Sequence, residues 1–165
     1  MSPRIGAFAV FSILALALWM AASFGGRGLF PFHTGAISPW SASPRSWVAH
    51  EPRNYTVGDK HTIIHPDLVH TLNERSMGRL PEWNPFQFAG LPHAANPLTG
   101  IWYPPNWLFH LAGPPHGYAL VAALHLFLAA LFAWMYLRAI DVGPAAAVIG
   151  GLAFALGGWM TVHHH

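Results

Sequence analysis

Apolar residues dominate three long stretches of the chain, and polar residues lie mainly between the first and the second. The first stretch, Ile5 to Phe24, contains no charged residue. The second, Gly117 to Leu137, is also uncharged and is followed by Arg138, while the third, Pro144 to Val162, is rich in glycine and alanine. A helix needs about 20 apolar residues to cross a bilayer. The pattern therefore predicts a mainly α-helical integral membrane protein with three transmembrane helices.

The second and third of these helices are expected to form a hairpin. The link between them, RAIDVG, is short, so the two helices should be antiparallel neighbours. Pro144 suits the first turn of a helix, where a backbone donor is not needed. The third helix also has a face of small residues that allows close packing against protein. This face consists of Gly150, Gly151, Gly157 and Gly158.

The first apolar stretch has two interpretations. Arg4 before it and the small residues Ala21 to Ser23 near its end are also features of a cleaved signal peptide, but we interpret the stretch as a retained anchor. Arg4 and Arg138 lie on one side of the membrane if the amino terminus is cytoplasmic, as the positive-inside rule favours. The predicted parts are a transmembrane helix over residues 1–24, an extracytoplasmic loop over 25–116 and a transmembrane helical hairpin over 117–165.

Within the loop, residues His65 to Gly78 have the signals of a short helix. Pro66 suits the first turn, Asp67 favours the positive end of the helix dipole, and Gly78 suits the position just after the last turn. One face is apolar, and it carries Leu68, Val69 and Leu72. We expect an amphipathic helix that lies on the membrane surface.

The segment LPEWNPFQFAGLPHAANP, from Leu80 to Pro97, has neither the alternation of a strand nor the period of a helix. Its prolines restrict the backbone, so we expect an ordered but irregular segment. Trp83 and Phe86 are expected to be buried. Asn84 and Asn96 should form hydrogen bonds with loop backbone groups that regular structure leaves unpaired.

Composition supports a membrane location and excludes several classes of site. Charged residues make up 8% of the chain and hydrophobic residues 53%, whereas soluble domains have about 25% charged residues. The net charge of +2, spread along the chain, excludes a nucleic-acid partner of the usual basic type. The chain has no cysteine, so disulfides, thiolate metal sites and cysteine nucleophiles are excluded.

Histidines and one aspartate suggest sites with two interpretations each. Asp59, His61, His65 and His70 are candidate ligands for a divalent metal, or Asp59 is a general base. The alternative is that these histidines are polar groups at an interface. His125 lies within the second apolar stretch, where it either ligates a haem iron or chlorophyll magnesium or hydrogen-bonds to a neighbouring helix. The terminal histidines, 163–165, are an external metal site, native sequence or a shortened tag.

Several separate motifs together resemble the start of the YfhO family, a group of bacterial membrane proteins of the glycosyltransferase-C superfamily. GDKHTIIHP is followed by a predicted helix, by the Pro/aromatic segment with YPPN after it, and by the second apolar stretch. The matching positions are Gly78, Leu80, Pro81, Trp83, Asn84, Pro85, Gly90, Pro92, Ala95, Asn96, Pro97 and Tyr103 to Asn106. The resemblance runs from about Gly58 to the carboxyl end.

This resemblance implies transfer of a sugar from a polyprenyl-phosphate carrier to an external acceptor at the bacterial cytoplasmic (inner) membrane. Asp59 matches the family's acidic residue and would be the catalytic or metal-binding carboxylate. A set of loop residues would bind substrate or form the wall of the site, namely Trp83, Asn84, Phe86, Asn96 and Tyr103. The alternative is that the aromatic side chains pack the loop onto the membrane helices.

The chain has fewer expected spans than the family it resembles, so we do not expect it to be a competent enzyme alone. A second hypothesis is a noncatalytic accessory or structural subunit of a larger integral membrane complex, for example a respiratory or photosynthetic one. Its partners would then be the lipid bilayer and other membrane protein chains.

Overall fold

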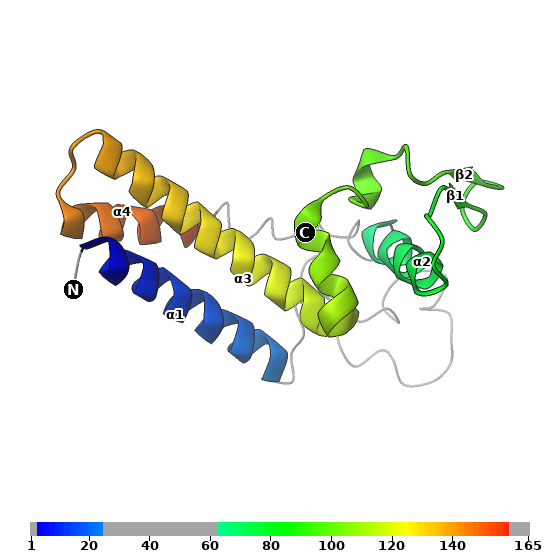
Figure 1. Ribbon diagram of the computed structural model, residues 1–165, viewed down its shortest axis with the longest axis horizontal. Coiled ribbons are helices and arrows are strands. Elements are labelled where there is room, and N and C mark those ends of the chain that lie inside the picture. The colour runs from blue at the N-terminus through cyan, green and yellow to red at the C-terminus, as the bar shows by residue number, and fades with distance from the viewer. Residues whose placement is uncertain (1–2, 25–62, 159–165) are drawn as a thin grey trace. The chain divides into compact units, whose positions relative to one another are not determined.

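The computed structural model describes residues 3–24 and 63–158 (Figure 1). These residues form two units. One contains helix α1 (Pro3–Phe24), helix α3 (Leu108–Ala139) from Pro115 onward, and helix α4 (Pro144–Ala155). The other contains residues 63–114. Asp59, His61 and the terminal histidines lie outside the described residues.

Two of the three expected spans have helices that are long and apolar enough to cross a membrane. They cover Arg4–Ala21 within α1 and His116–Ala139 within α3, with 18 and 24 residues. At about 1.5 Å per residue, these lengths are close to the thickness of a bilayer core. The helical class and two candidate spans are therefore confirmed.

The third expected span is not confirmed. α4 has 12 residues and ends at Ala155 rather than at Val162. At the helical rise this is only about 18 Å. The Leu156 amide donates to Leu152 and the Gly157 amide to Phe154 in a closing turn, so the regular helix ends just before Gly157 and Gly158. Residues 159–162 of the expected span lie outside the part that the structure describes.

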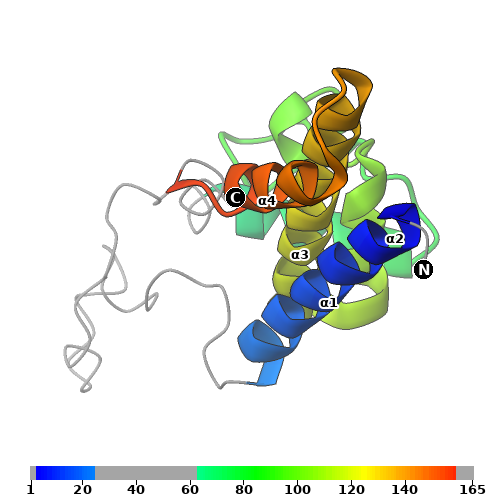
Figure 2. The same ribbon diagram turned by 90° about the vertical axis from the view of Figure 1, so that its left-hand side faces the viewer.

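Part of the glycine face of α4 packs closely against α1 and α3, and Figure 2 shows these three helices. A Cβ atom on Gly151 would lie 2.7 Å from the Ala130 carbonyl oxygen and 3.2 Å from the Phe11 ring. One on Gly150 would overlap Leu137. The small-residue prediction is confirmed at these two positions, whereas a Cβ on Gly158 would meet nothing within 4 Å.

In the second unit, helix α2 (His65–Ser76) matches the expected helix at both ends. Pro66 lies in its first turn, and Gly78 follows the helix with φ of +71°. The Gly78 amide donates to the Arg75 carbonyl at 2.9 Å, and the Arg79 amide donates to Glu74 at 3.0 Å. This pair of bonds is the Schellman arrangement, which satisfies carbonyls that a helix end leaves open.

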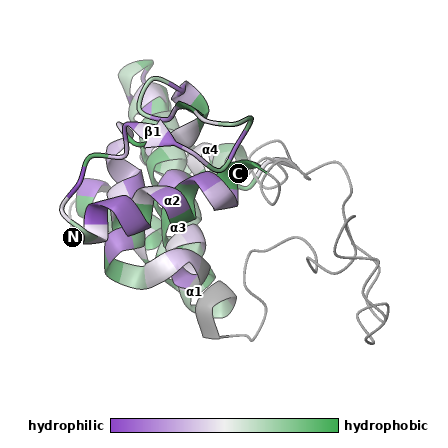
Figure 3. Ribbon diagram, turned by 90° about the vertical axis from the view of Figure 1, so that its right-hand side faces the viewer, coloured by the Kyte–Doolittle hydropathy of each residue, from purple (hydrophilic) through white to green (hydrophobic). Residues whose placement is uncertain are grey.

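The expected apolar face of α2 is buried at Leu68, half-buried at Leu72 and exposed at Val69. The buried residues of the helix are Asp67, Leu68, His70 and Thr71. Figure 3 shows α2 coloured largely as polar. The helix is buried through polar side chains because its partner, the segment that follows it, offers hydrogen-bonding groups rather than an apolar surface.

That following segment contains a minimal hairpin. Strand β1 (Trp83–Asn84) pairs antiparallel with β2 (Leu91–Pro92), so that Trp83 faces Pro92 and Asn84 faces Leu91. Short 3-10 helices follow at Pro97–Thr99 and Pro104–Trp107. The segment is ordered, as expected, and the hairpin is the regular element that the sequence pattern did not predict.

α3 has a break near its start. Gly113 has φ of +71° and ψ of 168°, and Pro114 follows it directly. A proline fits the first turn of a new helix. The break therefore ends the helical turn that belongs to residues 63–114 and begins the long apolar helix.

Candidate functional site

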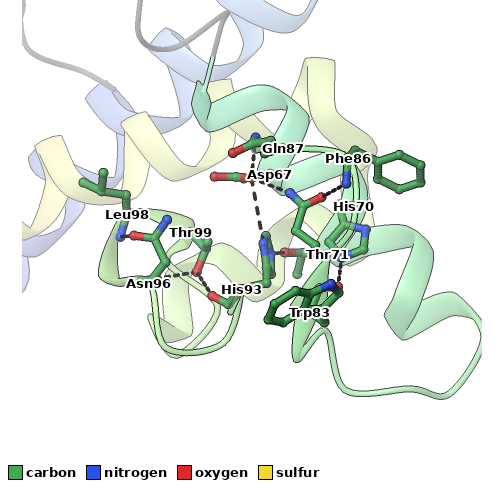
Figure 4. A network of polar contacts seen from close by, with 11 residues as sticks. Asp67, His70, Thr71, Trp83, Phe86, Gln87, His93, Asn96, Leu98 and Thr99 are labelled. Carbon is green, nitrogen blue, oxygen red and sulfur yellow. Dashed lines mark hydrogen bonds and ion pairs between the residues drawn. The ribbon is translucent and has the colours of Figure 1, made fainter. Parts of the chain in front are cut away.

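A buried cluster of polar side chains joins α2 to the hairpin segment (Figure 4). Asp67 is 1% exposed, Asn84 2% and His93 0%. Most polar groups buried this completely form hydrogen bonds that replace the water they lose. The cluster is completed by His70, Thr71, Gln87 and Thr99.

Asp67 is the centre of the cluster. Its Oδ1 accepts a hydrogen bond from Asn84 Nδ2 at 3.1 Å and one from Gln87 Nε2 at 3.0 Å. The same oxygen lies 3.8 Å from His93 Nδ1. Because Asp67 lies in the first turn of α2, the helix dipole also favours a carboxylate there. One oxygen thus holds two residues of the hairpin against α2.

His93 connects the carboxyl group to a hydroxyl group. Its Nε2 lies 2.8 Å from Thr71 Oγ1, and its backbone amide donates to the Glu82 carbonyl at 2.7 Å. Burial lowers the pKa of His93 more than neighbouring Asp67 raises it, and His70 lowers it further. The imidazole is therefore neutral at neutral pH. With Nδ1–H directed toward Asp67, Nε2 accepts from the Thr71 hydroxyl.

His70 supports the hairpin from a second position on α2. Its Nε2 lies 3.0 Å from the Trp83 carbonyl oxygen, so this nitrogen donates. Its ring packs edge-on against the rings of His93 and Phe86, with centroid distances of 4.8 and 5.9 Å. Asp67, His70 and Thr71 recur at helical spacing, which places all three on the face of α2 that meets the hairpin.

The two predicted asparagine contacts are confirmed. Asn84 Oδ1 accepts from the Phe86 amide at 2.9 Å, and Asn96 Oδ1 accepts from the Leu98 amide at 3.1 Å. Each is a short side-chain bond to the backbone two residues ahead, typical of asparagine in turns. Thr99 then donates to the Asn96 carbonyl at 2.8 Å.

The predicted burial of Trp83 and Phe86 is wrong. Trp83 is 54% exposed and Phe86 is 84% exposed. Neighbouring residues of a strand point to opposite faces, so the buried Asn84 directs Trp83 outward. The Trp83 indole lies over Gly90 instead, where an added Cβ would be only 2.6 Å from Cζ2. Figure 4 shows Phe86 directed away from the polar network.

Arg75 makes a second attachment of α2. Its Nη2 donates to the Ile101 carbonyl at 2.8 Å, and its Nη1 donates to His110 Nε2 at 3.2 Å. Burial and the adjacent guanidinium lower the pKa of His110, so that this ring is a neutral acceptor. The segment up to the start of α3 is thereby fixed to the same helix.

Of the other predicted site residues, the structure describes His65, His125 and Tyr103. His65 begins α2, and in the described ranges no group of three or more His, Asp or Glu could hold a metal. His125 Nδ1 lies 2.7 Å from the Val121 carbonyl oxygen of its own helix. Tyr103 precedes a 3-10 helix and is partly exposed.

The order carboxyl, imidazole, hydroxyl in Asp67, His93 and Thr71 is one that acid–base catalysis uses. Thr71, however, is only 5% exposed, so its hydroxyl is closed to a substrate. Asp67 Oδ2 and His93 Nδ1 have no hydrogen-bond partner within the described part of the chain. The cluster is therefore best understood as the attachment that holds the hairpin and its exposed aromatic side chains in place.

Sequence reasoning missed Gln87, Thr71 and His93 as members of this cluster. The polar stripe of Asp67, His70 and Thr71 was a usable signal, since polar residues at helical spacing within a loop helix suggest a polar partner.

Comparisons of the chain with family models, curated proteins and solved structures find no match.

Proposed function

We propose that the chain is the amino-terminal module of a membrane glycosyltransferase that uses a polyprenyl-phosphate sugar. Residues 63–114 form the wall of its external site, with Asp59 as the catalytic carboxylate that orients or deprotonates the acceptor hydroxyl. A divalent metal at this site would be held by Asp59, His61 and His65, of which His65 is the one whose position the structure describes.

One observation carries the proposal: residues of the family-like motifs hold the backbone of one ordered unit, residues 63–114. Gly78 closes α2, Gly90 admits the Trp83 ring, and Asn84 and Asn96 bond the loop backbone. Gly100 has φ of +61° and accepts from Asn106 Nδ2 at 3.0 Å. These contacts give residues 63–114 the ordered backbone that the wall of the proposed site requires.

In the proposed arrangement, the catalytic carboxylate and the carboxylate that stabilises the loop are different residues. Asp59 precedes α2, whereas the buried Asp67 belongs to the network that anchors the hairpin. Trp83 and Tyr103 are exposed and available to a sugar or a lipid chain. Aromatic side chains give large contact areas at little cost in conformational entropy.

In this proposal the amino terminus lies inside the cell. A membrane-impermeant reagent added outside should then label Asn73→Cys but not Asp141→Cys, which tests the orientation.

The experiment is Asp59→Asn in membranes that contain the chain with its natural partners, assayed for transfer of labelled sugar from polyprenyl phosphate. Loss of a positioned acid–base group lowers a rate by about 100-fold or more. Asp141→Asn is the matched control, because it removes a carboxyl from the α3–α4 turn, where asparagine tolerates φ of +62°. Wild-type transfer by Asp59→Asn would refute the assignment.

The accessory-subunit hypothesis is favoured by a different observation, the exposed aromatic surface of residues 63–114. Such surfaces often mark contacts with another protein or a membrane. Purification with native mass spectrometry separates the two functions. If other chains copurify in stoichiometric amounts and the intact assembly has no transfer activity, the accessory-subunit hypothesis would be favoured over the enzyme hypothesis.

A further inference from the structure

The loop that joins β1 to β2 presents two phenylalanine rings to solvent. We call residues 85–90 the tip. Phe86 and Phe88 are 84% and 92% exposed, and the value for Phe88 is the highest of any large hydrophobic side chain in residues 3–24 and 63–158. Single exposed apolar residues are common in folded proteins. Two on a six-residue tip are a concentrated apolar surface.

The backbone of the tip is in a conformation that phenylalanine rarely adopts. Phe88 and Ala89 have φ of +50° and +62°, followed by Gly90 at +111°. Residues other than glycine are uncommon at positive φ, and such strain persists only where the surroundings impose it. The Gly90 amide donates to the Gln87 carbonyl at 2.7 Å, which closes the turn around Phe88.

The tip is attached mainly at its base, and of its two rings Phe86 also meets His70 edge-on, with a centroid distance of 5.9 Å. Gln87 and Asn84 donate to the buried Asp67, and the Phe86 amide donates to Asn84 Oδ1. Trp83 lies over Gly90 across the hairpin. The two phenylalanines are therefore held outward before any partner is bound, so that little ordering entropy is lost on binding.

Charge and chain connection indicate what the tip contacts. Residues 83–92 contain no Asp, Glu, Lys or Arg. The same chain has two helices able to cross a bilayer, and α3 continues directly from the unit that carries the tip. The tip therefore belongs to a chain whose other unit is suited to a bilayer, and an uncharged aromatic loop suits the interfacial region of a bilayer.

We propose that the tip inserts Phe86 and Phe88 into the interface of the bilayer that α1 and α3 cross. This anchor fixes the external unit on the lipid surface whether or not the chain transfers sugar. Because the tip is uncharged, it binds neutral lipid and needs no anionic headgroup. Its partner is the acyl-chain region beneath the headgroups.

The absence of cysteine from the sequence allows a direct test with single labels. Phe88→Cys carrying an environment-sensitive fluorophore is reconstituted, in the full chain, into phosphatidylcholine vesicles with or without brominated acyl chains. The control is Asn73→Cys, which is exposed on α2. Quenching by bromine at position 88 should exceed that at position 73 by about twofold or more, with blue-shifted emission only at position 88.

Two results would overturn the proposal. Water-like, unquenched emission at position 88 would show that the tip does not enter the bilayer. Blue-shifted emission that bromine leaves unchanged, and that varies with the protein-to-lipid ratio, would assign the tip to a second copy of the chain. Phe86→Cys is the second test site if the first variant is misfolded by circular dichroism. The vesicle assay contains no sugar donor, so a negative result for membrane insertion says nothing about sugar transfer and can be distinguished from failure of the proposed function.

Discussion

Replacing Asp67 by alanine removes the acceptor on which the polar cluster depends. Asn84 Nδ2, from a residue only 2% exposed, and the half-buried Gln87 Nε2 would lose their partner, and His93 would lose the nearby carboxyl group. An unsatisfied buried donor costs about 1–3 kcal/mol. Counting Asn84 in this range and Gln87 at about 1 kcal/mol, because water reaches it, gives about 2–4 kcal/mol for opening the hairpin.

Native-state hydrogen exchange measures this cost without unfolding α1 and α3. The His93 amide, which donates to the Glu82 carbonyl, reports the hairpin. Its protection should fall by about 30-fold to 1,000-fold, since 1.4 kcal/mol is a factor of ten. The Leu156 amide in the other unit donates to Leu152 and should be unchanged.

Asp67→Asn is the matched control. It keeps an oxygen at the position that accepts from Asn84 and Gln87, and it places the new amide where Oδ2 has no hydrogen-bond partner in the described residues. Its cost should be smaller than that of Asp67→Ala. Unchanged His93 protection in Asp67→Ala would refute the anchoring role, and equal losses in both variants would assign the effect to charge rather than to hydrogen bonding.

Two further predictions concern the same unit. Burial lowers the pKa of His93 below its ordinary value of 6.5, so the unfolded state binds the proton more readily than the folded state. The stability of the unit should be fully retained above about pH 6.5 and should fall as the pH drops toward the lowered pKa. Protection of the Asn96 amide, corrected for intrinsic exchange, checks this, and a rise in protection on acidification would contradict it. Gly90→Ala adds a Cβ 2.6 Å from Trp83 at φ of +111°. It should lower the free energy of unfolding by more than Gly78→Ala, whose Cβ meets nothing within 4 Å and which should cost only the roughly 1–2 kcal/mol of left-handed strain. Equal urea midpoints for the two variants would show that the Trp83 contact is unimportant.

The parts of the fold that were predictable depend on local signals. Pro66 and Gly78 mark the ends of α2 because each acts on backbone groups within one turn. Gly150 and Gly151 likewise indicate close helix packing, since only residue size matters there. The early end of α4 was not foreseen, because glycine is tolerated in some membrane helices and ends others.

The candidate site was less predictable because its contacts join distant residues. Asp67 and His93 are 26 positions apart, and nothing in the spacing of either indicates the other. The error over Trp83 has a similar origin. Aromatic content indicated burial, whereas the pairing of β1 with β2 decided which of Trp83 and Asn84 faces inward.

The polar face of α2 has a consequence for folding beside the bilayer that we propose for this chain. Hydrocarbon competes with apolar protein surfaces, because an apolar side chain gains as much from lipid as from a protein core. If the hairpin were held to α2 by apolar contacts, lipid would therefore compete with the hairpin for the apolar surface of α2 during synthesis. Asp67, His70 and Thr71 have no such rival, since a polar face gains nothing from hydrocarbon and stays hydrated until Asn84 and His93 arrive.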